Sequence, residues 1–180
     1  MNDRAVQISR AALAVFARYG LKRASMADVA EEAGLSRPAI YQYFRSKQDL
    51  VAACFDLVTE DGFALAEQAA AAQSGRERRV AAYLSAHMCF FHRLIYAGPH
   101  SDEVLELKTQ FGADKVAAAR ARLVARLNAL AGREAGDDLG FILAHGAEGI
   151  KTLTPDEAVL ARRLVRLVHA LMAEDHTAPH

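Results

Sequence analysis

The 180-residue sequence predicts an all-helical protein, and three observations support this fold class. Alanine, the residue with the highest helix propensity, supplies 38 positions. Only four prolines occur, and Pro38, Pro99 and Pro155 stand where a helix is expected to begin or break. Alternating apolar and polar runs joined by hairpin dipeptides are missing from the sequence, so we expect no strands.

The first helix is expected over residues 3–19, because apolar residues recur at three- and four-residue steps until Gly20. A short second helix follows over residues 26–33, where Ser25 caps the backbone donors and Asp28 reaches back from the third helical position. Both helices are therefore predicted from their end residues as well as from their periodicity.

A tight turn at Gly34 follows, and Ser36 caps a third short helix that carries Pro38 in its first turn. Ser46 caps a long fourth helix, with Asp49 as its reciprocal acid. This fourth helix is expected over residues 46–73 and the fifth over residues 76–96. A sixth segment is capped by Ser101, and a seventh ends near Leu130. The eighth helix is expected over residues 137–151, and the last begins at Thr154 and Pro155.

Residues 33–36 join the two short helices in the layout of a helix-turn-helix, which places its second helix in a DNA major groove. Gly34 relaxes the steric limit at the sharp turn, and Ala30 leaves room for the helices to cross closely. In this layout the outward-facing first residues of the third helix can reach base edges, and these residues are Arg37, Pro38 and Ala39.

The zero net charge of the chain hides an asymmetry between its two parts. Residues 1–50 hold eight basic and five acidic side chains, whereas the other 130 residues hold 14 basic and 17 acidic ones. No acid occurs between Glu32 and Asp49, where Arg37, Arg45 and Lys47 stand. Phosphates at the third helix would therefore meet only positive charge.

The stretch from Ser25 to Leu50 resembles the DNA-binding domain of TetR-family transcriptional regulators. The resemblance lies in the glycine turn, the Ile-Tyr-x-Tyr-Phe segment at 40–44 and the Ser-Lys-x-x-Leu segment at 46–50. It covers about residues 3–55 in sequence and the rest in architecture only. It implies that bases are read by Arg37, Pro38 and Ala39, and that phosphates are bound by Ser25, Met26, Tyr41, Tyr43 and Lys47.

Within these roles, Arg37 is the expected guanine contact, because a guanidinium matches the O6 and N7 acceptors of that base. Ala27 stands where some members of the family carry a long base-reading side chain, so specificity is expected to depend more heavily on Arg37. In the alternative interpretation, Tyr41 and Phe44 only pack the helices together and Arg45 is solvated.

The predicted architecture is a three-helix helix-turn-helix DNA-binding domain over residues 1–47, joined by the long fourth helix to a helical-bundle effector and dimerisation domain over residues 48–175. A flexible tail is expected over residues 176–180, and the chain should contain about nine helices. The resemblance implies dimerisation through the last two helices, whose apolar seams and small residues support it. The expected interface residues are Leu139, Leu143, Gly146, Ile150, Leu160, Leu164, Leu167 and Leu171. Alternatively, both helices bury these residues inside one subunit.

An effector site is expected around the fifth helix, where His87 lies on an otherwise apolar stripe. The candidate pocket residues are His87, Phe91, Tyr96, Phe63, Phe111 and His145. The alternative is that His87 is a hydrogen-bonded core histidine. We expect no metal and no cofactor, because His87 and His92 lie about 140° apart on a helix and no phosphate-binding loop occurs.

These features predict a homodimeric transcriptional repressor that a small molecule releases from a palindromic DNA operator. The alternative is a DNA-bound adaptor whose C-terminal domain binds a protein. An enzyme is not expected, because no nucleophile, base and orienting group stand at a recognisable spacing. Two isolated cysteines, the lack of a signal peptide and a longest uncharged apolar stretch of twelve residues, 80–91, favour a cytoplasmic protein without a membrane partner.

Overall fold

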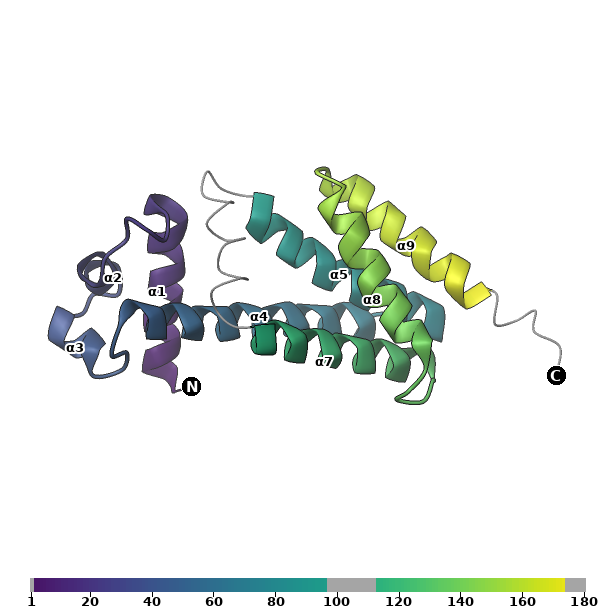
Figure 1. Ribbon diagram of the computed structural model, residues 1–180, viewed down its shortest axis with the longest axis horizontal. Helices are drawn as coiled ribbons and strands as arrows, with labels where there is room; N and C mark the ends of the chain where they lie inside the picture. The colour runs from purple at the N-terminus through teal and green to yellow at the C-terminus, as the bar shows by residue number, and fades with distance from the viewer. Residues whose placement is uncertain (1, 97–112, 174–180) are drawn as a thin grey trace. The chain divides into compact units, whose positions relative to one another are not determined.

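The computed structural model describes residues 2–96 and 113–173, and all the regular structure in these ranges is helical (Figure 1). This confirms the predicted all-α fold. The expected helix capped by Ser101 lies outside the described residues. The eight helices of the described ranges are α1 (Asp3–Tyr19), α2 (Met26–Glu32), α3 (Arg37–Tyr41), α4 (Lys47–Ala71), α5 (Arg76–Tyr96), α7 (Ala113–Ala131), α8 (Asp138–Thr152) and α9 (Glu157–Ala173).

The described residues fall into two compact units, which divide within α4. Residues 2–61 form the N-terminal unit, and residues 62–96 and 113–173 form the C-terminal unit. Each unit has a buried apolar cluster of its own, so each has the core that a folding unit requires.

The core of the N-terminal unit joins α1, α2, α3 and the first half of α4. Ile8, Ile40 and Leu50 are fully buried in it, together with Val29 of α2. Polar contacts fasten α1 to α4: the Cys54 thiol donates to the carbonyl oxygen of Ser9, and Arg10 forms a two-pronged ion pair with Asp61 at 2.5 and 2.8 Å. The short helices α2 and α3 share this core with the longer helices α1 and α4, which these contacts hold together.

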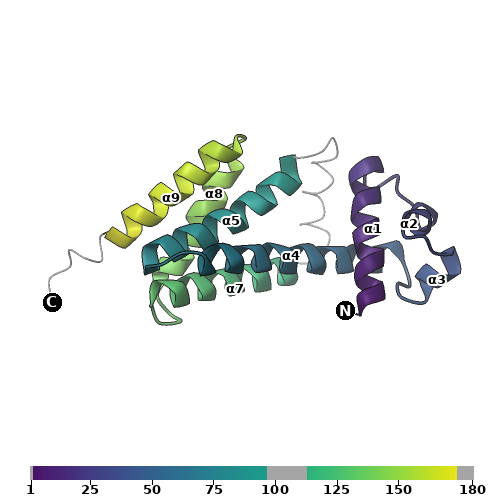
Figure 2. The ribbon, with the colours of Figure 1, turned by 180° about the vertical axis from the view of Figure 1, so that it is seen from behind.

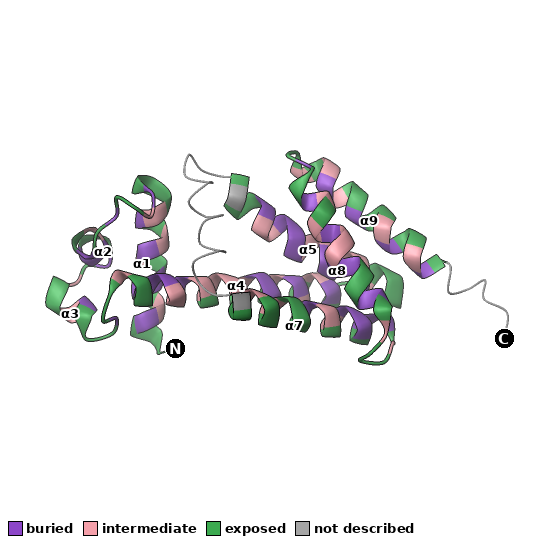
Figure 3. Cartoon of the chain, in the orientation of Figure 1, coloured by how far each residue is buried: buried purple, intermediate pink, exposed green. Residues whose placement is uncertain are grey.

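In the C-terminal unit, α5 packs along α9 and also contacts α7 and α8, as the reverse view shows (Figure 2). The buried face of each helix is turned toward these neighbours and the outer face is exposed (Figure 3). The second half of α4 supplies Phe63 to this core and is joined to α7 by a bidentate Arg126–Glu67 ion pair, with both N–O distances at 2.6 Å.

Within the described ranges, no helix is both long and apolar enough to cross a lipid bilayer.

The corner between α8 and α9 differs from the expected one. Thr154 does not cap α9, because its hydroxyl donates to the Ile150 carbonyl at 2.6 Å and thereby closes the end of α8. The cap of α9 is Asp156, whose carboxylate accepts from the Val159 amide at 2.8 Å. A similar difference occurs at α4, where Asp49 accepts from the Arg45 amide instead of that of the cap Ser46.

Gly140 allows α8 to approach α7 closely. Its amide donates to Oδ1 of the fully buried Asn128 at 2.6 Å, and the Asn128 side chain donates to the Asp137 carbonyl at 2.8 Å. A Cβ added at Gly140 would overlap the backbone oxygen of Val124 and lie 2.5 Å from Asn128 Oδ1. A glycine is therefore required at this contact, whereas a Cβ added at Gly149 on the same helix meets no atom within 4 Å.

We expect Gly140→Ala to lower the free energy of unfolding by about 1–3 kcal/mol, because the added methyl forces α8 away from α7. The matched control, Gly149→Ala, should raise it by about 0.5–1 kcal/mol, because it removes a glycine from a helix interior without a steric conflict. Urea unfolding of both variants measures the two changes. A Gly140→Ala protein as stable as the Gly149→Ala protein would contradict this packing.

Candidate nucleic-acid interface

The start of α2 is fixed by reciprocal hydrogen bonds between Ser25 and Asp28. The Ser25 amide donates to the Asp28 carboxylate at 2.7 Å, and the Asp28 amide donates to the Ser25 hydroxyl at 3.2 Å. The hydrogen bonds from the Ser25 hydroxyl and amide lower the pKa of Asp28. This is the predicted capping box, and it holds the first turn of α2 at the protein surface.

The turn after α2 brings α3 across it, as the sequence predicts. Gly34 has a φ of +64°, in the left-handed region that favours glycine. The Leu35 amide donates to the Ala30 carbonyl at 2.9 Å, which closes the end of α2. The methyl side chain of Ala30 is buried at this crossing, as expected.

The side chains of α3 divide into an inner and an outer set. Ile40 is fully buried, so it fixes the rotation of the helix about its axis. Arg37 and Pro38 are exposed on the outer side and Ala39 is half-buried. The Ser36 hydroxyl accepts from the Ala39 amide at 3.3 Å, which caps the end that these residues share. The predicted base-reading residues therefore lie together at the exposed N-terminal end of α3.

The two tyrosines of this region are exposed, and Phe44 is buried. Tyr41 ends α3, whereas Tyr43 follows in a turn, so the Ile-Tyr-x-Tyr-Phe segment extends beyond the helix. The Tyr41 hydroxyl accepts from Arg37 at 3.5 Å, and the Arg37 guanidinium lies 5.7 Å from the Tyr41 ring centroid. Of the two interpretations, packing applies to Phe44, while the side chains of Tyr41 and Tyr43 are exposed.

Met26 and Lys47, two of the expected phosphate contacts, are less exposed than such contacts are expected to be. The Met26 side chain is buried, so only its backbone amide is available to a phosphate. Lys47 is half-buried, and its ammonium donates to the Ala24 carbonyl at 2.6 Å. Lys22 and Arg23, which are not among the contacts expected from the sequence, are exposed in the loop just before Ser25. Their position directly before a helix cap is the feature of the sequence that indicates them.

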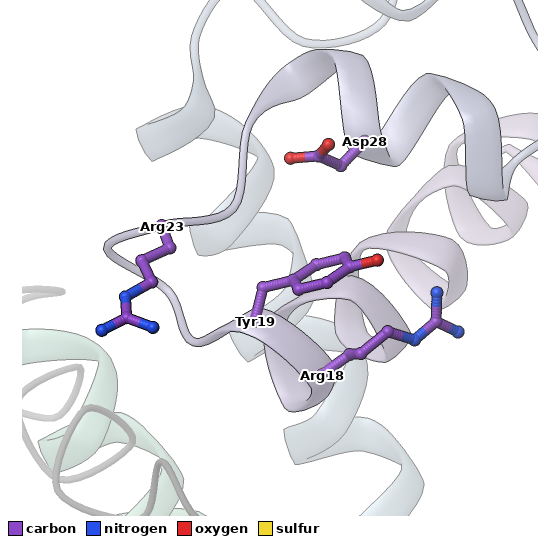
Figure 4. A pocket seen from close by; sticks show the side chains of 4 residues that line it. All are labelled: Arg18, Tyr19, Arg23 and Asp28. Carbon is purple, nitrogen blue, oxygen red and sulfur yellow. The ribbon is translucent and has the colours of Figure 1, made fainter.

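A shallow surface depression lies beside this loop, lined by Arg18, Tyr19, Arg23 and Asp28 (Figure 4). Arg18 pairs with Glu32 at 3.0 Å and its guanidinium lies 5.6 Å from the Tyr19 ring centroid. Because the carboxylate of Asp28 shares this depression with the two arginines, its charge is mixed. The uniformly basic surface predicted from the sequence belongs to the segment between Glu32 and Asp49.

In the C-terminal unit, three of the candidate pocket residues come together. The His87 ring centroid lies 4.9 Å from that of Phe63 and 5.0 Å from that of Phe91, and it stacks parallel to Tyr83 at 6.4 Å. Burial lowers the pKa of His87 to about 4, so the imidazole is neutral near pH 7. The Gly62 backbone opposes this shift only weakly, and the buried Nδ1 has no hydrogen-bond partner.

The other candidates are placed differently. The Tyr96 ring lies tilted against that of His92 with the centroids 4.5 Å apart, and His145 packs against Phe141 with the centroids 3.9 Å apart. Phe111 lies outside the described residues. The structure thus assembles a core group of His87, Phe63 and Phe91. His87 is buried, as the alternative of a hydrogen-bonded core histidine expects, but its Nδ1 has no hydrogen-bond partner.

Four of the expected dimer contacts are already covered within one subunit. Leu143, Leu160 and Leu164 are fully buried in the core of the C-terminal unit, and Leu139 is also buried. The remaining four are half-buried: Gly146, Ile150, Leu167 and Leu171. The leucine seam of α9, formed by Leu160, Leu164, Leu167 and Leu171, therefore packs inward. The exposed large apolar side chains of α8, α9 and their connection are Phe141, Ile142, Leu153 and Val165.

Residues 8–54, which hold the helix-turn-helix, match the family described as bacterial regulatory proteins, tetR family. The HTH-type transcriptional regulator TtgR of Pseudomonas putida is 44% identical over 54 residues, which cover 30% of this chain and 26% of TtgR. The matched segment therefore spans about a quarter of that relative's length.

Solved structures resemble nearly the whole chain, at low sequence identity. The transcriptional regulator FadR of Bacillus subtilis in complex with stearoyl-CoA has a TM-score of 0.58 at 19% identity, with 97% of this chain and 99% of that chain covered. A TetR transcription regulator of Haloarcula marismortui has a TM-score of 0.70 at 14% identity, with 97% and 98% covered. At such identities the likeness shows the fold alone.

Proposed function

We propose that the chain is a TetR-family transcriptional regulator and that it acts as a homodimeric repressor, which a small molecule releases from a palindromic DNA operator. The observation that carries the DNA-binding part is the exposed N-terminal end of α3, where Arg37, Pro38 and Ala39 lie together above the buried Ile40. The operator is in the cytoplasm, so we place the protein there.

In this proposal Arg37 reads a guanine, while the hydroxyls of Ser25, Tyr41 and Tyr43 and the backbone amide of Met26 bind phosphates. The contact between Arg37 and Tyr41 supports this division, because it holds the guanidinium at the end of α3 before DNA arrives. Lys47 belongs to the same surface, although two backbone carbonyls already occupy its ammonium.

The proposed dimer contact uses the outer faces of α8 and α9 instead of the leucine seam. Ile142 and Val165 are about half exposed, and Phe141 and Leu153 are more exposed still. Large apolar side chains gathered on one pair of helices are typical of a contact with a second copy, and a two-fold dimer matches a palindromic operator. Of the interface residues expected from the sequence, Ile150, Leu167 and Leu171 are half-buried and can lie at the edge of this contact.

The proposed effector site is the group formed by His87, Phe63 and Phe91. We place the proton of the neutral imidazole on Nε2, which makes Nδ1 an unpartnered acceptor among aromatic rings. This arrangement favours an apolar molecule that donates one hydrogen bond, because such a molecule satisfies Nδ1 and keeps its other atoms in apolar contact. FadR, whose fold is similar, was solved in complex with stearoyl-CoA, which supports a ligand-responsive role for this fold. Effector binding would then favour a conformation in which the two recognition helices no longer fit the operator.

We expect Arg37→Ala to weaken operator binding about 10- to 100-fold and to relax specificity at one base pair, because a bidentate guanine contact is lost. The operator is first identified by genome-wide mapping of bound sites, and affinity is then measured by fluorescence anisotropy at fixed salt. Arg120→Ala removes the same charge from the exposed surface of α7 and serves as the control. Equal affinities of the two variants would exclude the assigned role of Arg37.

We expect Ile142→Glu to convert the dimer to a monomer at micromolar concentration, because a carboxylate would be buried without a partner. Sedimentation velocity measures the change. Leu94→Glu introduces the same charge at an exposed apolar position of α5 and should leave the dimer intact. A monomeric unmodified chain, or a dimeric Ile142→Glu variant, would refute the assigned contact.

We expect 4-propylphenol to raise the thermal unfolding midpoint more than 4-propylanisole does, because only the phenol can donate to His87 Nδ1. In His87→Leu the two compounds should raise the unfolding midpoint by the same amount. Equal shifts in the unmodified protein would exclude the assigned role of Nδ1. A midpoint that responds to neither compound would favour an adaptor whose C-terminal unit binds a protein.

A further inference from the structure

Lys47, the first residue of α4, turns its ammonium toward the loop between α1 and α2. Its Nζ donates to the carbonyl oxygens of Ala24 at 2.6 Å and Lys22 at 3.4 Å. Two of the three ammonium hydrogens are therefore engaged by backbone in the absence of DNA. Arg45, two residues earlier in the chain, is exposed, so the two cations of this segment are held differently.

The loop that Lys47 contacts leads directly into α2. Ala24 is buried, and its amide donates to the Gly20 carbonyl at 3.1 Å, which closes the loop into a turn. The next residue is Ser25, which caps α2 and carries one of the proposed phosphate contacts. The loop conformation thus determines where the Ser25 hydroxyl and the first amides of α2 stand.

We propose that Lys47 is a positioning residue for DNA binding: its ammonium holds the loop over residues 20–25 in the conformation in which Ser25 and the first turn of α2 meet a phosphate. This rests on the proposed function, in which this surface binds DNA. The bonds to Ala24 and Lys22 hold the ammonium against the loop and leave one hydrogen for a phosphate. In this proposal, loss of the ammonium weakens DNA binding because it also releases the loop from α4.

Amide hydrogen exchange in the DNA-free protein tests this attachment. Lys47→Met keeps the aliphatic stem and removes the ammonium, whereas the control Arg45→Gln removes one positive charge from the same segment without touching the loop. We expect the amides of Ala24 and Ser25 to exchange about tenfold faster in Lys47→Met, while the amide of Val15 in α1 keeps its rate. Arg45→Gln should leave all three rates unchanged.

The outcomes separate the positioning role from the proposed function. Unchanged exchange at Ala24 and Ser25 would overturn the attachment, and faster exchange with undiminished operator affinity would overturn the positioning role. Failure of the unmodified chain to bind any duplex would refute the proposed function and leave the exchange comparison intact. If Lys47→Met also speeds exchange at Val15, the variant has lost stability in general, and the test is made on the unmodified protein by NMR. A detectable Lys47 ammonium resonance at pH 7 supports the attachment, and an undetectable one overturns it.

Discussion

A helix of five residues cannot maintain its shape through its own hydrogen bonds, because helix nucleation is unfavourable and few bonds follow it. The helix α3 therefore depends on the burial of Ile40 in a core that α1, α2 and α4 complete. That burial fixes the rotation of the helix, and rotation decides that Arg37 and Pro38 face outward. The proposed DNA-reading surface therefore depends on one buried isoleucine and on the turn at Gly34 that precedes α3.

Local features of the fold could be predicted from the sequence, because the residues that determine them are neighbours in the chain. The Ser25–Asp28 capping box and the Gly34 turn are examples. Features that depend on distant residues could not. Thr154 looks like a cap for α9, but its hydroxyl is used by the preceding helix, and Asp156 takes the capping role. Lys47 stands in a basic segment, yet its ammonium contacts carbonyls 23 and 25 residues earlier.

The C-terminal unit shows the same limit in another form. A leucine repeat says that one face of a helix is covered, but it does not say by which chain. Leu160 and Leu164 are buried within their own subunit, so the contact that we propose with a second copy uses side chains that remain exposed. The periodicity of α5 likewise placed His87 on an apolar face, while only the fold brings Phe63 of α4 to it.

The corner between α8 and α9 is held by contacts from three helices. The Thr154 hydroxyl accepts from Arg163 of α9 at 2.7 Å, and its carbonyl contacts His92 Nε2 of α5 at 2.8 Å. With the bond to Ile150, this leaves the two helices little freedom to pivot about their connection. A surface built on both helices is consequently preorganised, so association through it would cost little conformational entropy.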